Sequence, residues 1–188
     1  SNSTAVGYQA GYGNTGSYLT AFGYQAGYSN TDSSGGVFIG FQAGKANTSG
    51  AANVFIGQGA GVTNTTGGNN TSVGYAALQA NTTAGNNTVI GYSAGFNNTT
   101  GAANTFVGDS SGYTNSTGLY NAGFGRRSLY ANTTGSYNTA LGPQDAGNYG
   151  VLSANTTGGY NVAVGAGSLA SNTTAGNNVA VGYQAAYS

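Results

Sequence analysis

A seventeen-residue repeat limits the folds open to this chain more than its composition does. A glycine that follows an apolar residue recurs at this interval from Gly23 to Gly142. The interval before Gly23 is one residue shorter, and a six-residue insertion, Pro143–Asn148, lengthens the interval after Gly142. The chain therefore consists of about eleven coils. Self-similarity at a short fixed period is the mark of a stacked repeat architecture.

A coil of this length is too short for a helix pair or a propeller blade, and it shows no helical periodicity. We therefore predict an all-β fold in which residues 1–188 form one β-solenoid domain (a β-helix or β-roll), with the insertion as a loop. Two or three short strands per coil would pair with the same strands of the next coil, about 4.8 Å away. Eleven coils at that rise make a rod of about 50 Å. The handedness stays open, with a left-handed winding preferred.

One position is apolar in every coil and is predicted to face the core. An aspartate at Ile90 would then place an unpaired charge in the interior, whereas Lys45→Ala should be tolerated. This column precedes the repeat glycine and comprises Val6, Phe22, Ile39, Ile56, Val73, Ile90, Val107, Phe124, Leu141, Val164 and Val181. A second column, three residues after the glycine, is small, from Ala10 and Ala26 to Ser111 and Ser128.

An asparagine stands seven residues after the repeat glycine in each coil, once the insertion is removed. Identical amides stacked coil on coil can form a hydrogen-bonded ladder. The predicted structural ladder comprises Asn14, Asn30, Asn47, Asn64, Asn81, Asn98, Asn115, Asn132, Asn155 and Asn172. Asn-Thr-Thr segments such as Asn64–Thr66 also match the N-glycosylation pattern, but we interpret them first as a turn and a ladder.

Composition excludes several classes of function. Apolar residues make up 38% of the chain, aromatic residues 12% and charged residues 3%, with zero formal net charge. This mixture favours a packed chain over a disordered one. It leaves no electrostatic footprint for nucleic acid, and no apolar stretch is long enough to span a membrane. The absence of cysteine excludes disulfides.

The chain lacks the residues that usually carry catalysis. It contains no His, Cys or Glu, so we predict no catalytic residue, no metal site and no cofactor site. Calcium-binding repeats would need an aspartate in each coil. The few charged residues test the predicted register. Asp109 and Arg126 are one repeat apart and should form an ion pair on adjacent coils. A second ion pair is proposed between Arg127 and Asp145 of the insertion.

Two surface arrays admit a ligand-binding alternative. The residue after each ladder asparagine is Thr or Ser, and regular Thr arrays on flat solenoid faces occur in ice-binding proteins. Against ice binding, Asp32 and the shortened first interval break the array. Tyr-rich columns one and five residues after the glycine offer rings for carbohydrate, or simply form aromatic ladders. The insertion, which holds the only proline, is the best single candidate for a specialised contact.

The repeat units carry a resemblance. Gly7–Gly11 and Gly23–Gly27 read GYQAG, and Asn132–Gly135 and Asn155–Gly158 read NTTG. These units resemble repeats of phage tail-fibre and bacterial surface proteins, which often precede a self-cleaving endosialidase-type chaperone domain. They are similar, more distantly, to the head repeats of trimeric autotransporter adhesins, whose repeat length is different. The resemblance implies an extracellular or virion-surface fibre, often trimeric, and transfers no functional residues.

The leading hypothesis is therefore a non-catalytic structural protein: an extracellular filament, an adhesin shaft or a tail-fibre segment. The expected partners are further copies of the chain, in a homotrimer or stacked head to tail, with cell-surface glycans as a further possibility. If the insertion is removed and the residue missing before Gly23 is restored, the length of the chain is four residues short of eleven full coils. Copies are therefore expected to stack head to tail in coil register. A ligand-binding solenoid for ice or carbohydrate is the alternative.

Overall fold

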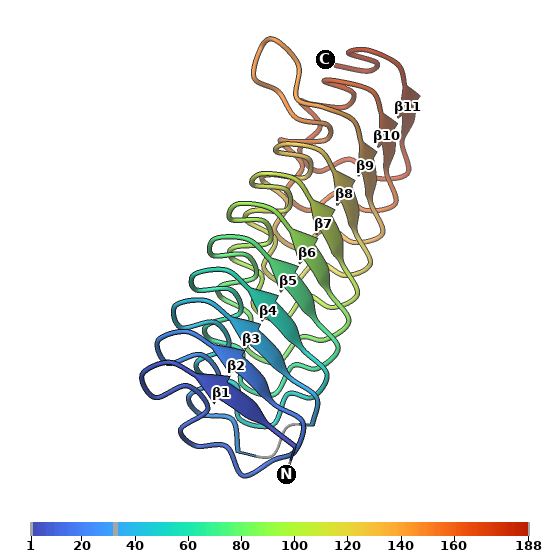
Figure 1. Ribbon diagram of the computed structural model, residues 1–188. Helices are drawn as coiled ribbons and strands as arrows, with labels where there is room; N and C mark the ends of the chain where they lie inside the picture. The colour runs from blue at the N-terminus through green and yellow to red at the C-terminus, as the bar shows by residue number, and fades with distance from the viewer. Residues whose placement is uncertain (1, 32–33, 188) are drawn as a thin grey trace.

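The computed structural model describes residues 2–31 and 34–187, and over this part the chain winds into a solenoid rod with one short strand per coil (Figure 1). The strands are β1 (Thr4–Val6), β2 (Thr20–Phe22), β3 (Val37–Ile39), β4 (Val54–Ile56), β5 (Thr71–Val73), β6 (Thr88–Ile90), β7 (Thr105–Val107), β8 (Ala122–Phe124), β9 (Thr139–Leu141), β10 (Val162–Val164) and β11 (Val179–Val181). No helix in this part of the chain is long and apolar enough to cross a membrane.

The strands form one parallel sheet in sequence order, β1 to β11. Thr4 pairs with Thr20 across the shortened interval, and Val162 pairs with Thr139 across the insertion. All other neighbours pair at the regular repeat interval, as Thr88 does with Thr105. The all-β solenoid of about eleven coils, wound at the predicted period, is therefore confirmed.

Each coil holds one strand where two or three were expected. The remaining sides still hydrogen-bond from coil to coil, as Gly44 N does to Ala60 O at 2.9 Å. They contain residues with left-handed backbone, such as Gln42 (φ 56°) and Leu78 (φ 54°). Such residues interrupt the extended conformation that a longer strand requires, so these sides remain turns.

The repeat glycine is required by close backbone packing. Gly91 has φ +140°, and a Cβ placed there would lie 2.4 Å from the carbonyl oxygen of Gly108 on the next coil. Side chains avoid both that backbone region and that contact. The glycine column therefore marks the corner at which successive coils approach most closely.

The apolar column before this glycine faces outward, so its assignment to the core was wrong. Val89, in the middle of β6, is fully buried, whereas Ile90 beside it is 39% exposed. Successive side chains of a strand point to opposite faces, so the middle residue of each strand faces inward. Seven members of the column are exposed and the other four are half-buried: Val6, Phe22, Ile39, Ile90, Phe124, Leu141 and Val181, then Ile56, Val73, Val107 and Val164.

The true core combines large and small residues within each coil. Where the middle strand residue is Phe106, the residue six positions later is Gly112, and a Cβ on that glycine would lie 2.6 Å from the phenyl ring. Where the middle residue is Ala163, Leu169 takes the later position, and both are buried. The predicted small column is inward as expected: Ala26, Ala43, Ala60, Ala77 and Ala94 are fully buried. In these coils the two positions therefore exchange volume, whereas the residue in the small column stays small.

The predicted asparagine ladder is present over its whole length. Each side-chain Nδ2 donates to the Oδ1 of the asparagine one coil earlier, as Asn115 does to Asn98 at 2.7 Å and Asn132 does to Asn115 at 2.7 Å. The same links join Asn30 to Asn14 and Asn172 to Asn155 at the two ends. Most rungs also donate to a carbonyl three residues later, as Asn132 does to Gly135 O at 2.9 Å. The ladder therefore fixes the turn in each coil and the register between coils.

A second asparagine ladder was missed. Its Oδ1 atoms accept from the backbone N–H of the next rung, as Asn70 Oδ1 does from Asn87 N at 3.0 Å. Most of its Nδ2 atoms donate to carbonyls of the following turn, although Asn87 Nδ2 has no hydrogen-bond partner among the described residues. The signal was available, because from the fourth coil onward the column is unbroken in the sequence: Asn53, Asn70, Asn87, Asn104, Asn121, Asn138, Asn161 and Asn178.

Candidate functional site

The sheet has a continuous solvent-facing side that runs along the rod. It is formed by the first and third residues of each strand, and we call it the outer face. The third residues are the apolar column described above, and the first residues are Thr, Val or Ala in every strand. Eleven strands at about 4.8 Å spacing, each about three residues long, give a surface on the order of 500 Å². A surface of that size lies within the range of the largest patch on a typical monomer, and such patches are often functional.

The asparagine ladders present nothing to a ligand. Asn64, Asn81 and Asn132, which begin the Asn-Thr-Thr segments, are fully buried. Their amide groups are used in the ladder and in the turn. A glycan cannot be accommodated on such side chains in the folded chain, so these segments serve as ladder and turn.

The threonine column beside the ladder uses its hydroxyl hydrogens internally. Thr65 Oγ1 donates to Thr82 O at 2.9 Å, and Thr99 Oγ1 donates to Ser116 O at 3.0 Å. The same bond recurs up to Thr156, which donates to Thr173 O. Asp32, which was expected to interrupt this array, lies outside the described residues. This column therefore uses its hydroxyl donors inside the rod, whereas the second threonine of each segment, such as Thr66, Thr83 and Thr100, is exposed, and the ice-binding alternative stays a prediction.

The tyrosine columns are stacks whose ring faces cover one another. Tyr8, Tyr24 and Phe41 stack with centroids 5.4 and 5.1 Å apart, and Tyr12 and Tyr28 stack at 5.3 Å. A further stack, which the sequence reasoning missed, joins Tyr120, Tyr137 and Tyr160 at 5.1 and 4.9 Å. A sugar needs an open ring face, and such faces remain only where a stack ends. The continuous columns are thus aromatic ladders.

The charged residues meet the predictions in part. Arg126 Nε lies 3.2 Å from Asp109 Oδ2 on the adjacent coil, which confirms the register. Both side chains are largely exposed, so the pair contributes about 0–1 kcal/mol. The guessed pair of Arg127 with Asp145 is wrong: the carboxylate of Asp145 accepts hydrogen bonds from Tyr149 N at 2.8 Å and Gln184 Nε2 at 3.1 Å. These bonds hold the pKa of Asp145 below its ordinary value.

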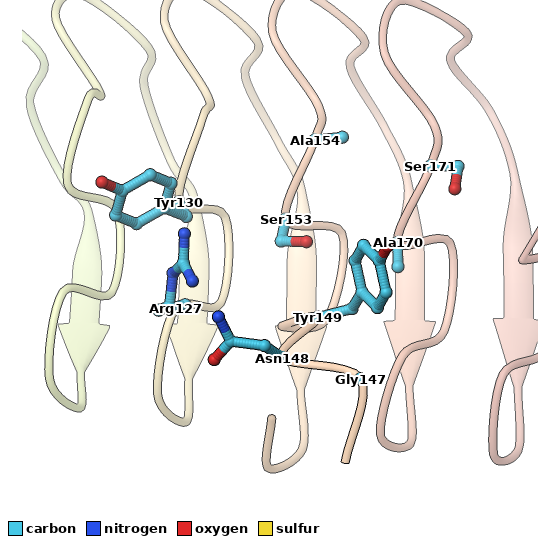
Figure 2. A pocket seen from close by; sticks show the side chains of 9 residues that line it. All are labelled: Arg127, Tyr130, Gly147, Asn148, Tyr149, Ser153, Ala154, Ala170 and Ser171. Carbon is cyan, nitrogen blue, oxygen red and sulfur yellow. The ribbon is translucent and has the colours of Figure 1, made fainter. Parts of the chain in front are cut away.

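The insertion forms a hollow on the side of the rod (Figure 2). Its volume is about 510 Å³, and its lining comprises Arg127, Tyr130, Gly147, Asn148, Tyr149, Ser153, Ala154, Ala170 and Ser171. Tyr149 also contacts Tyr187 edge to face, with centroids 5.4 Å apart. A hydrogen bond with the Tyr149 side chain, followed by burial, raises the pKa of Tyr187 to about 12. The hollow thus has aromatic, amide, hydroxyl and guanidinium groups around one space.

The described residues bring together no group of three or more His, Cys, Asp or Glu that could hold a metal. Comparisons of the chain with protein-family models, with curated proteins and with solved structures found no match.

Proposed function

We propose that this chain is a non-catalytic structural segment of an extracellular or virion-surface fibre, and that its outer face packs against further copies of itself. The observation that carries the proposal is the continuous apolar column of the outer face. Every coil places Val, Ile, Leu or Phe at a position that faces away from the core. Strand propensity and pairing between coils favour Val, Ile and Phe here, and a second chain on this face would cover the apolar surface that remains exposed.

Covering this face has a large hydrophobic benefit. At about 25 cal/mol per Å², burial of the apolar half of the face, roughly 250 Å² on one chain, corresponds to about 6 kcal/mol before the costs of association. The face is straight and repeats at the strand spacing, so a second copy presents a surface of matching period. Closed symmetric assemblies satisfy such a surface on every copy.

Among closed assemblies we propose the homotrimer, in which three rods place their outer faces around one axis. The resemblance of the repeats to those of phage tail fibres and adhesin heads supports this choice, as does the presence of the face on one side of the rod.

Along the axis, β1 pairs only with β2 and β11 only with β10 in the described chain. A neighbouring coil can therefore continue either edge, which extends the rod.

Sedimentation velocity of the purified chain tests the proposal. We expect the wild-type chain to sediment as a trimer, or as a longer polymer of that unit, at micromolar concentration. Ile90→Glu should shift it to a monomer, because a charge on the outer face cannot be buried without a counter-charge. The matched control is Thr83→Glu, at an exposed position of the same coil outside the outer face, which should leave the assembly unchanged. A monomeric wild-type chain, or an equal effect of both variants, would refute the proposal.

A further inference from the structure

The hollow lies where an aromatic column is interrupted. Five residues after the repeat glycine, Phe96, Tyr113 and Tyr130 stack with centroids 5.2 and 5.3 Å apart. On the next two coils the same column holds Ser153 and Ala170, and a ring returns only at Tyr187. Two adjacent small residues therefore end the stack of Phe96, Tyr113 and Tyr130, just as Lys45, Val62 and Gln79 interrupt the same column nearer the N-terminus.

The insertion covers this gap and is held in a defined shape. Asp145 N donates to Tyr149 O at 2.9 Å, and Asp145 Oδ1 accepts from Tyr149 N. Asp145 Oδ2 accepts from Gln184 on the final coil, which fastens the loop to the rod two coils away. Asp145 itself is only 9% exposed, whereas Tyr149 is 44% exposed and its ring faces the hollow (Figure 2).

Arg127 brings an uncompensated positive charge to the hollow. Its Cζ lies 4.4 Å from the centroid of the Tyr130 ring, so a cation–π contact orients the guanidinium. Within residues 2–31 and 34–187, the one ion pair joins Arg126 to Asp109, and the carboxylate of Asp145 is engaged by Tyr149 and Gln184. The guanidinium thus keeps donors for an anionic group that enters from solvent.

We propose that this hollow binds an acidic saccharide, a sugar that carries a carboxylate, as uronic and sialic acids do. The carboxylate pairs with the Arg127 guanidinium, which suits a planar two-oxygen acceptor. The sugar ring lies against Tyr149, while Asn148, Ser153 and Ser171 offer hydrogen bonds to its hydroxyl groups. The volume of about 510 Å³ falls within the range of small-ligand sites and is large enough for one or two sugar rings.

A smaller hollow on the same rod shows what distinguishes this site. It has a volume of about 170 Å³ and lies where both aromatic columns lack rings, at Gln58 in one column and at Val62 and Gln79 in the other. No charged residue lines it. A gap in an aromatic column alone therefore gives a small uncharged depression, whereas the insertion and Arg127 give the larger site its cover and its charge.

The test is saturation-transfer NMR and calorimetry on the whole chain with matched sugars. We expect 3′-sialyllactose or a glucuronate-containing disaccharide to bind with Kd below about 1 mM, and neutral lactose to bind at least tenfold more weakly. Arg127→Gln and Tyr149→Ala should each weaken binding of the acidic sugar at least tenfold. The control Arg126→Gln, in the neighbouring exposed ion pair, should change Kd less than twofold.

Three results would overturn the proposal: equal binding of acidic and neutral sugars, no binding of either acidic sugar at 10 mM, or an equal effect of the Arg126 and Arg127 variants. Arg127→Lys provides a second variant that keeps the charge, and it should bind better than Arg127→Gln. Acetate at 10 mM should not displace the sugar, and displacement would show that the site selects an anion rather than a saccharide. Circular dichroism establishes that each variant is folded. The site uses none of the outer-face residues, so its failure would leave the fibre proposal standing.

Discussion

The inner and outer faces of the sheet are both apolar, but they differ in how their side chains vary. The inner column runs through residues as different as Phe55, Ser72, Val89 and Gly123, whereas the third position of the outer face is always Val, Ile, Leu or Phe. In several coils the residue six positions later compensates for the volume of the inner residue, as Gly112 does for Phe106 and Leu169 does for Ala163. The outer column has no such partner and yet stays apolar, and solvent does not select for that. In our proposal the invariant apolar column is an interface between chains, whereas the variable inner column faces the core.

The strongest contrast is expected between neighbouring residues on the two faces of β6. Val89→Asp places a charge in the closed core and should cost more than about 4 kcal/mol or prevent folding. Ile90→Asp, on the outer face, should change the unfolding free energy of the monomer by less than about 1 kcal/mol. Thermal unfolding followed by circular dichroism, at a concentration where the chain is monomeric, measures both. Equal destabilisation would contradict the observed orientation of the strand.

The second prediction tests volume exchange inside one coil. Phe106→Ala should cost about 3–5 kcal/mol through the cavity it leaves. Gly112→Leu should also destabilise, because the new side chain meets the Phe106 ring and the backbone there has φ +60°. The double variant reproduces the Ala163–Leu169 combination of a later coil and should recover most of the loss. Denaturant unfolding of the four chains gives the coupling, and strictly additive costs would refute the exchange.

A weaker effect is expected in the first asparagine ladder. Asn115→Ala removes the acceptor of Asn132 Nδ2 and the donor to Asn98 Oδ1, both in the interior. The unfolding free energy should fall by about 1–3 kcal/mol. Thr117→Ala, at an exposed position two residues away, should stay within about 0.5 kcal/mol. If the two substitutions cost the same, the ladder does not stabilise the stack.

The seventeen-residue period predicted the fold, the register and the first asparagine ladder. It could do so because stacking brings each position of a coil into contact with the same position of the next coil. It could not orient the strands, since both faces are apolar and alternation alone does not say which face is enclosed. The core was hidden because its positions exchange volume, as Phe106 with Gly112 and Ala163 with Leu169 do, and so no single column looks like a core. The hollow depends on where Pro143–Asn148 folds back, and that is set by contacts such as Asp145 with Gln184, 39 residues apart.

A distance measurement between chains shows directly whether the outer face is an interface. The chain has no cysteine, so Ile90→Cys provides a unique site for a nitroxide spin label, and Thr83→Cys provides the control. Packed sheet faces lie about 10 Å apart, so assembled chains labelled at Ile90→Cys should show strong dipolar broadening that disappears when they are diluted with unlabelled chains. Labels at Thr83→Cys should show little broadening. Broadening at Thr83→Cys without broadening at Ile90→Cys would mean that the chains pack through another surface.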